Sequence, residues 1–318
     1  MSADWRPTAP IERLRERARF VSRLRAFLEA RGLWEVETQI LDPAGTTDPH
    51  IHPLSTQVQG ADGPQRLYLH TSPEFHMKRL LAAGSGPIYQ IARVFRDQER
   101  GPRHLVEFTL LEWYRPGWDH HRLMEEVDQL LQGVADAPPA QYQSYAELFR
   151  ERLDLDPHRA ETTTLYACAR HHGLDAPAGL DRDALLDLLM GVLVEPELGR
   201  QHPLLIYDYP ASQAALARIR PGDPPVAERF ELYWKGVELA NGFHELTDPR
   251  EQRRRFLEDR RRRQAQGLAD IPHDERLIAA LEAGLPPCAG VALGVDRLFM
   301  IVSGVSAIDH VVAFPHRN

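Results

Sequence analysis

Residues 94–114 read VFRDQERGPRHLVEFTLLEWY, in which one predicted strand runs into a charged loop and a second strand follows. The first strand is expected over residues 88–95, and the second, which is apolar and aromatic, over residues 108–114. A planar arginine at the rigid end of a strand, here Arg96, suits a bidentate grip on a phosphate, and the nearby Phe108 ring can stack on a base. Taken alone, the stretch is equally consistent with a solvated hairpin turn.

A second stretch, residues 238–246, reads ELANGFHEL and places two carboxylates around a run of small residues. Mg²⁺ binds one or two carboxylates and takes its other ligands from phosphates and water, so Glu238 and Glu245 are candidate metal ligands. On an unbroken strand these two positions face opposite sides, so the metal site requires a bulge or turn, which we expect at Asn241–Gly242. The alternative is a plain hairpin with exposed acids.

A third stretch, residues 290–298, reads GVALGVDRL and predicts an apolar strand that breaks at a glycine and leads into a helix. Gly294 would allow a ligand to approach the backbone closely. Arg297 lies near the expected helix N-terminus, where it could meet a terminal phosphate. The alternative is a tight strand-to-helix turn with a surface arginine.

Apolar spacing predicts the remaining elements. Helices are expected over residues 11–32, from Pro73 through Leu81, and over 249–266, and strands over 33–39, 66–70, 204–207, 229–239 and 290–293. Strands without regular alternation with helices favour a mainly antiparallel sheet flanked by helices, an α+β fold. We expect a single catalytic domain over residues 1–318, with a helical insertion at about 120–200.

The bulk composition describes a globular chain. It has 318 residues, 43% hydrophobic and 26% charged, and its apolar runs are too short to cross a membrane. The N-terminus lacks the apolar region of a secretory signal, so we expect a cytoplasmic protein without membrane partners. Cys168 and Cys288 are expected to be reduced thiols. The formal charge of -8 gives no general attraction for nucleic acid.

Two further features are assigned no chemistry. The histidine pairs at 120–121 and 171–172 lack an evident partner cluster, so surface positions are more common for them than metal ligation. An arginine-rich run at 250–263 is interleaved with acids, which predicts a solvated, ion-paired helix face. The alternative for that run is a docking patch for an acidic protein or for RNA.

Together, the three stretches resemble the second and third signature motifs of class II aminoacyl-tRNA synthetases. More narrowly, the segments Thr71–Glu74, Phe108–Tyr114 and Glu238–Asp248 look like the lysyl-tRNA synthetase branch. The whole chain is similar to the elongation factor P lysine lysyltransferase family. The resemblance implies the class II synthetase catalytic fold and homodimers.

The resemblance also implies roles for individual residues. Arg96 would hold the α-phosphate of ATP and Arg297 its γ-phosphate, which makes both catalytic. Glu238 and Glu245 would bind Mg²⁺ with the nucleotide. The other ATP-binding residues would be Asp97, Gln98, Phe108, Leu239 and Gly294, and the amino acid would be surrounded by Ser72, Pro73, Glu74, Tyr114 and Glu245. The motif usually has glutamate where this chain has Gln98, and Glu99 follows one residue later.

The implied reaction begins with attack of the lysine or β-lysine carboxylate on ATP, and the ε-amine of a lysine on elongation factor P then attacks the adenylate. The first long helix begins near Ile11, which leaves no room for an N-terminal anticodon-binding barrel. We therefore expect a protein acceptor and no stable tRNA binding. The alternatives are a truncated synthetase that charges tRNA, an asparagine synthetase-like amide former, and a silent regulatory paralogue.

Overall fold

The computed structural model describes residues 5–98 and 101–316, and the chain divides into two compact units. The first unit comprises Met1–Gly117, Thr247–Cys288 and Ala292–Asn318. The second comprises Trp118–Leu246 and Ala289–Val291. Strand β12 (Cys288–Gly294) contributes residues to both.

The first unit combines two sets of strands with helices. Its strands are β1 (Trp34–Glu35), β2 (Leu41–Asp42), β3 (Ser55–Gly60), β4 (Gly63–Leu69), β5 (Ile88–Phe95) and β6 (Glu107–Pro116). Its helices are α1 (Ile11–Glu29), α2 (Glu74–Ala82), α7 (Pro249–Ala265), α8 (Glu275–Gly284), α9 (Val295–Val302) and the short η4 (Ile308–His310). Strand β5 lies between β1, which is parallel to it, and β6, which is antiparallel, while β2, β4 and β3 form a separate antiparallel sheet.

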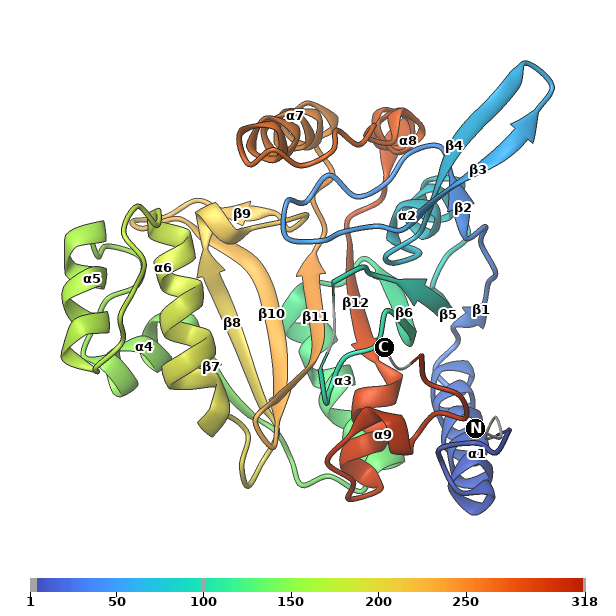
Figure 1. Cartoon of the computed structure of the whole chain (residues 1–318), viewed down its shortest axis with the longest axis horizontal. Coiled ribbons are helices and arrows are strands. Elements are labelled where there is room, and N and C mark those ends of the chain that lie inside the picture. Colours follow the sequence, from blue (N-terminus) through green and yellow to red (C-terminus); the bar gives the residue numbers. More distant parts are fainter. Residues whose placement is uncertain (1–4, 99–100, 317–318) are drawn as a thin grey trace. The chain divides into compact units, whose positions relative to one another are not determined.

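The second unit has the strand order β11-β10-β8-β7, with β9 paired to β10. Its strands are β7 (Gln141–Ser144), β8 (Leu204–Pro210), β9 (Ile219–Arg220), β10 (Val226–Trp234) and β11 (Val237–His244). Its helices are α3 (His120–Ala135), α4 (Tyr145–Leu153), α5 (Thr162–His171), α6 (Arg182–Leu189), η1 (Met190–Val194), η2 (Glu195–Glu197) and η3 (Ala211–Gln213). Helices α4, α5 and α6 lie together beside β8 (Figure 1).

Each unit has its own apolar core. In the first unit, α1 buries Phe20, whose ring centroid lies 5.4 Å from that of Phe299 on α9. In the second unit, Tyr145 and Phe149 on α4 stack 4.5 Å apart and pack with residues of α5, α6 and β8. A helix or sheet is stable only where its apolar face is covered in this way, so these contacts hold the strands that carry the candidate site.

Most of the predicted elements are confirmed, including the helices that begin at Ile11, after Pro73 and at Pro249, and the strands over 88–95 and 108–114. The strand expected over 33–39 is only two residues long. Strand β3 was not predicted, because its sequence STQVQG is polar and largely exposed. The fold is mainly antiparallel α+β, as predicted.

One long predicted strand is wrong. Residues 229–239 form parts of two strands, because the chain reverses at Lys235 and Gly236, which have φ angles of 53° and 67°. Two successive positive φ angles are typical of the tight hairpin turns that match strand twist. The turn expected at Asn241–Gly242 is absent, and both residues lie inside β11. Gly242 is required there, since a Cβ atom would collide with the ring of Phe230.

The segment expected as a helical insertion contains helices α3 to α6 and also strand β7, which the sequence did not predict. Helix α4 begins with a capping box, in which Ser144 accepts from the Glu147 N–H and the Glu147 carboxylate accepts from the Ser144 N–H. Whether the chain acts as a single catalytic domain with an insertion stays a prediction.

The arginine-rich helix α7 is ion-paired, as predicted. Glu251 binds Arg254 and Arg255, and Arg253 binds Glu275 of α8. Arg263 is an exception, because it is buried and donates to the carbonyl oxygens of Asp48 and Ala269. Cys168 and Cys288 are both free thiols, as expected. Among the described residues, no helix has the length and apolar character needed to cross a membrane.

Candidate active site

Four of the residues that could surround an amino acid come together at the start of α2 and on strand β6. The carboxylate of Glu112 is buried, with 1% of the residue exposed, and accepts hydrogen bonds from the hydroxyls of Ser72 and Tyr114, each at 2.6 Å. Ser72 Oγ in turn accepts from the backbone N–H of Glu74 at 3.0 Å. Ser72, Glu74 and Tyr114 were predicted from the sequence, whereas Glu112 was not.

This cluster, which we call the acidic cluster, contains two carboxylates and one buried ammonium. Lys78 is 1% exposed, and its Nζ lies 2.6 Å from Glu74 Oε1, one helical turn away on α2. Burial, followed by the repulsion from Glu74, raises the pKa of Glu112 to about 7. Glu112 is therefore poised to ionise when a further positive charge arrives.

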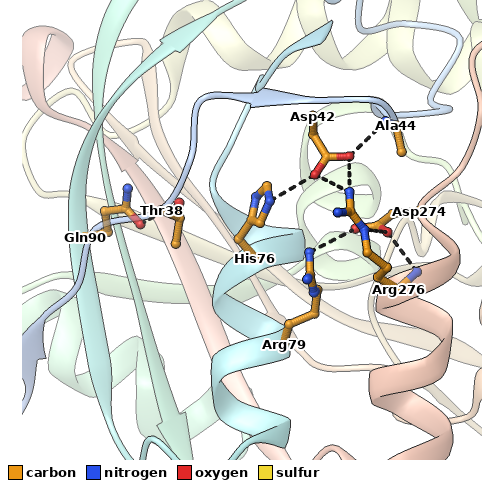
Figure 2. A network of polar contacts seen from close by, with 8 residues as sticks. All are labelled: Thr38, Asp42, Ala44, His76, Arg79, Gln90, Asp274 and Arg276. Atoms are coloured by element: carbon orange, nitrogen blue, oxygen red, sulfur yellow. Dashed lines mark hydrogen bonds and ion pairs between the residues drawn. The ribbon is translucent and has the colours of Figure 1, made fainter. Parts of the chain in front are cut away.

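A polar network holds α2, which carries Glu74, against the neighbouring elements (Figure 2). Asp42 of β2 accepts from the guanidinium of Arg276 at 2.6 Å, and the His76 ring lies 3.1 Å from the same carboxylate. On the other side of the network, Arg79 faces Asp274 at 4.0 Å. These contacts join α2, the helix that carries Glu74 of the acidic cluster, to β2 and α8.

Arg96, which directly follows β5, lies beside Phe108, the second residue of β6. The Arg96 guanidinium is 5.2 Å from the centroid of the Phe108 ring, and its Nε donates to the carbonyl oxygen of Thr71 at 3.2 Å. Pro73, the N-cap of α2, is buried. A guanidinium held at one end by a carbonyl and beside a ring keeps its planar donor edge oriented, as phosphate binding requires.

The loop after Arg96 is ordered by backbone bonds. The Asp97 N–H donates to the carbonyl oxygen of His52 at 2.7 Å, and the Asp97 carboxylate accepts from the Gln98 N–H at 2.8 Å. Gln98 is exposed and has a φ of 66°, in the left-handed region that non-glycine residues adopt infrequently. Glu99, the glutamate displaced by one position from its usual place, lies outside the described residues.

Arg297 is held by the architecture around α9. Its Nε donates to the carbonyl oxygen of Arg103 at 3.2 Å. The preceding residue, Asp296, is buried and accepts from the Thr109 N–H and from Arg17, both at 2.6 Å. Asp296 thus fixes the first turn of α9 to β6 and α1, which positions Arg297. Gly294 is the N-cap of α9 and has a φ of -72°, so its backbone conformation does not itself require glycine.

In the second unit, a bulge determines which way Glu238 points. The register pairs Tyr233 with Glu238 and Leu232 with Ala240, so Leu239 is the extra residue on β11. An extra residue reverses the alternation of side chains, which places Glu238 on the same face as Asn241. The bend that the metal hypothesis requires is therefore present, but it lies at Leu239 and not at Asn241–Gly242.

Glu245 follows directly after β11 and is 2% exposed. It forms a bridge with Ala217, and the next residue, Leu246, donates its N–H to the carbonyl oxygen of Leu216. Continued alternation from Phe243 returns Glu245 to the face of Glu238. The two carboxylates thus share a face of β11, which is compatible with the metal role that the sequence predicts.

The face of Glu238 also carries a buried network that the sequence did not predict. Glu231 accepts from the hydroxyls of Tyr209 at 2.7 Å and Tyr233 at 2.6 Å, and it binds the guanidinium of Arg229. Burial lowers the pKa of Arg229, but the charge of Glu231 and those of the neighbouring Tyr209, Glu238 and Tyr233 together outweigh burial and raise the pKa. Arg229 also donates to Asn241 Oδ1 at 3.3 Å, which fixes β10 to β11.

The residues missed by the sequence analysis share one property. Glu112, Glu231 and Asp296 are buried acids that each directly follow an apolar residue. A charge in such a place is costly unless it is paired, so each should have a partner. Tyr114 and Arg229 lie only two residues from Glu112 and Glu231, on the same strands. Other partners, such as Ser72 for Glu112 and Arg17 for Asp296, come from distant parts of the chain, and no local pattern identifies them.

The profile of the family described as "tRNA synthetases class II (D, K and N)" matches residues 2–318 of this chain. Its relatives include proteins named elongation factor P–(R)-beta-lysine ligase. The one from Klebsiella pneumoniae strain 342 is 52% identical over 317 residues, covering 98% of each chain. Those from Haemophilus influenzae strain PittGG and Vibrio vulnificus strain YJ016 are 51% and 52% identical, covering 98% or more of each chain.

The chain therefore belongs to the class II tRNA synthetase family of the D, K and N type and, within it, to the family of the elongation factor P–(R)-beta-lysine ligases. The family membership and the fold class that the three sequence stretches predict are confirmed. The roles of the individual site residues stay predictions.

Proposed function

We propose that this chain is an ATP-dependent ligase that activates lysine, in the β form, as its adenylate and transfers it to a lysine ε-amine of elongation factor P. The names of the relatives, which match over nearly their whole length, support the reaction and both substrates. The single structural observation that carries the proposal is the acidic cluster, in which Glu112 is bonded to Ser72 and Tyr114 and feels the charge of Glu74.

The acidic cluster suits a substrate that carries ammonium groups. Lys78 already neutralises Glu74, and Glu112 has a pKa raised to about 7, so a cationic ligand would draw Glu112 into its ionised form. Ser72 and Tyr114 would then orient the carboxylate through their hydroxyls, while Pro73 shapes the wall at the start of α2. A pocket built to bond an amino group rejects analogues without one, because its buried polar atoms would lose their partner.

In the first unit, Arg96 would contact the α-phosphate and Arg297 the γ-phosphate of ATP. Arginine is suited to both roles, because attack of a carboxylate on a triphosphate brings two anions together. Phe108 would stack on adenine, and Asp97, Gln98 and Gly294 would complete the contacts. The carboxylate of the amino acid forms a bond to the α-phosphorus, and the bond to pyrophosphate breaks.

In the second unit, Glu238 and Glu245 would hold Mg²⁺, and Leu239 would contact the nucleotide through the bulge. The residues fit the ion, since hard carboxylate oxygens on one face of a strand are the ligand type that Mg²⁺ prefers. When bound, Mg²⁺ would neutralise charge on the phosphates. Glu245 is also a candidate contact for the amino acid.

In the second step, the ε-amine of the acceptor lysine attacks the acyl carbon of the adenylate. An amide bond forms, AMP leaves, and the amine loses a proton. We propose that elongation factor P is the acceptor in place of tRNA, that the protein works in the cytoplasm, and that it acts as a homodimer, the commonest symmetric assembly.

The test is amino-acid-dependent exchange of pyrophosphate into ATP, scanned over (R)-β-lysine, (S)-β-lysine, α-lysine, aspartate and asparagine. We expect the strongest exchange with a β-lysine. Transfer is then measured to elongation factor P, to a variant of elongation factor P whose acceptor lysine is replaced by arginine, and to lysine tRNA. Labelling of the unaltered factor alone supports the proposal, whereas charging of the tRNA, or exchange with aspartate alone, contradicts it.

A further inference from the structure

A cluster of possible metal ligands lies in the second unit, where α3 meets the ends of β10 and β11. It consists of His120, Glu228 and His244, and one ligand atom from each lies within 4.8 Å of the other two. The cluster is well shielded from solvent, because His120 and Glu228 are buried and the His244 side chain is 15% exposed. Histidine nitrogens with a carboxylate oxygen are the donor set typical of zinc and related divalent ions.

The histidine at the centre of this cluster is unusual. His120 is 1% exposed, and within the described part of the chain neither of its ring nitrogens has a hydrogen-bond partner. Buried polar atoms are almost always bonded, and one that is not needs an explanation. The sequence-based prediction that this histidine pair lies at the surface is wrong for His120, which is the first residue of α3 and points into the unit.

A second orphaned atom lies next to the first. Asp208 Oδ1 on β8 is also buried without a hydrogen-bond partner among the described residues, and it lies 3.8 Å from His120 Nε2. That separation is too long for a hydrogen bond. It is close to the roughly 3.3–3.5 Å that separates two ligands of one tetrahedral zinc ion with bonds of about 2.0–2.1 Å.

We propose that His120, His244 and Glu228 bind a divalent transition-metal ion of the zinc class, with Asp208 or a water molecule as the fourth ligand. Binding replaces the 2.7 Å hydrogen bond between His244 Nδ1 and Glu228 Oε2 with two metal bonds, and the shared proton is released. The nitrogen of His120 and the oxygen of Asp208 then gain the partner that the protein alone does not supply.

The charges around the cluster permit a cation. Arg220 binds the other oxygen of Asp208 at 2.5 Å and lies 3.7 Å from Glu228, as does Arg218. Both guanidiniums are exposed, at 42% and 57%, so solvent screens their charges. Arg220, bonded to the outer oxygen of Asp208, would orient that carboxylate, as second partners do in established metal sites.

The proposed ion would join three elements of the second unit. It would link the N-terminus of α3 to β10 and to the last residue of β11, and the next residue along the chain is Glu245. Since Glu245 is a candidate ligand of the proposed ligase reaction, the ion would stabilise the strand end that presents it. This role is structural and independent of ATP or amino acid.

The test is metal content by mass spectrometry after the purified protein is incubated with ZnSO₄ and dialysed, together with the visible spectrum after loading with Co²⁺. We expect about one ion per chain and the strong visible bands of four-coordinate Co²⁺. His120→Ala and Glu228→Gln should each weaken zinc binding by more than about 10–100-fold, which is the loss seen when even an outer partner of a metal ligand is altered. Thermal unfolding of the untreated and zinc-loaded protein provides a readout that needs no variant.

The matched control is the double variant His171→Ala/His172→Ala, which removes the other histidine pair from α5. It should retain the full zinc content and the Co²⁺ spectrum. The proposal is overturned if the unaltered protein retains no zinc after dialysis. Equal zinc retention by Glu228→Gln and the unaltered protein, or loss of zinc in the α5 double variant alone, would also overturn it.

Discussion

Two buried glutamates have nearly the same local bonding and opposite electrostatic situations. Glu112 in the first unit accepts from the hydroxyls of Ser72 and Tyr114, and Glu231 in the second accepts from those of Tyr209 and Tyr233. Glu231 is paired with the guanidinium of Arg229. For Glu112, the largest influence on the pKa after burial is instead a second carboxylate, that of Glu74.

The comparison separates a structural glutamate from one that is suited to a ligand. A buried carboxylate that is paired with a permanent cation is already neutralised by it. Removal of the carboxylate leaves the cation buried and unpaired. The pKa of Glu112 is instead raised to about 7, and the positive charge of a bound ammonium group would stabilise its ionised form. The charges of the acidic cluster therefore favour binding of a cationic substrate, whereas the Arg229–Glu231 pair stabilises the folded state.

The largest effect is expected for Glu231→Gln. Loss of the charge leaves the buried Arg229 without its carboxylate, so the free energy of unfolding should fall by about 3–5 kcal/mol. Urea unfolding followed by circular dichroism measures this change. A loss below about 1 kcal/mol would show that Arg229 finds other partners and that the contrast between the two glutamates is weaker than the geometry indicates.

Glu112→Gln should act mainly on activity. The amide keeps the size of the side chain but cannot balance a substrate ammonium, which is a loss of about 1.5–3 kcal/mol. The kcat/KM for β-lysine in the exchange reaction should therefore fall by about 10- to 150-fold. The matched control is Glu107→Gln, an exposed position on the same strand, whose kcat/KM should stay near that of the unaltered protein.

The pH dependence of stability should differ between the protein and its Glu112→Gln variant. The folded-state pKa of Glu112 is raised to about 7, above its ordinary value of 4.5, so the folded state holds an extra proton between these limits. The contribution of Glu112 to the free energy of unfolding is thus fully present below pH 4.5 and is lost as the pH rises through 7. Between pH 4.5 and 7, the free energy of unfolding of the variant should fall by about 1–3 kcal/mol less than that of the unaltered protein. Urea unfolding at four pH values measures this difference. Parallel pH profiles would contradict the raised pKa.

The smallest effect is expected for an ion pair at the surface. Arg253 of α7 binds Glu275 of α8, but both side chains are substantially exposed, at 40% and 58%. Arg253→Ala should change the free energy of unfolding by less than about 1 kcal/mol, because water and salt screen such pairs. Thermal unfolding at low and high salt checks this. A loss close to that of Glu231→Gln would mean that burial does not determine how much an ion pair contributes to the free energy of unfolding.

Local patterns predicted much of the fold and of the candidate site. The apolar spacing from Ile11, the strand at 88–95 and the charged helix at 249–266 were read correctly, because helix and strand periods are local properties. Arg96, Phe108, Ser72, Glu74 and Tyr114 were selected as candidates, and the structure places Arg96 beside Phe108 and groups the other three. Their roles still await measurement.

Other features were not predicted from local patterns. The bulge that turns Glu238 depends on how β11 is registered against β10, and the burial of His120 depends on how α3 packs in its unit. The turn at Lys235–Gly236 was missed because the apolar residues on both sides looked like one strand.

By itself, the sequence determined the kind of chemistry, since arginines at strand and helix ends and paired carboxylates are local motifs whose order along the chain marks the family. Only the tertiary structure decided which charges are balanced. Glu112, Glu231 and Asp296 are all buried acids, and each has a partner that is distant along the chain, namely Ser72, Tyr209 and Arg17. Coulomb energies depend on distances in space that the order of residues does not contain.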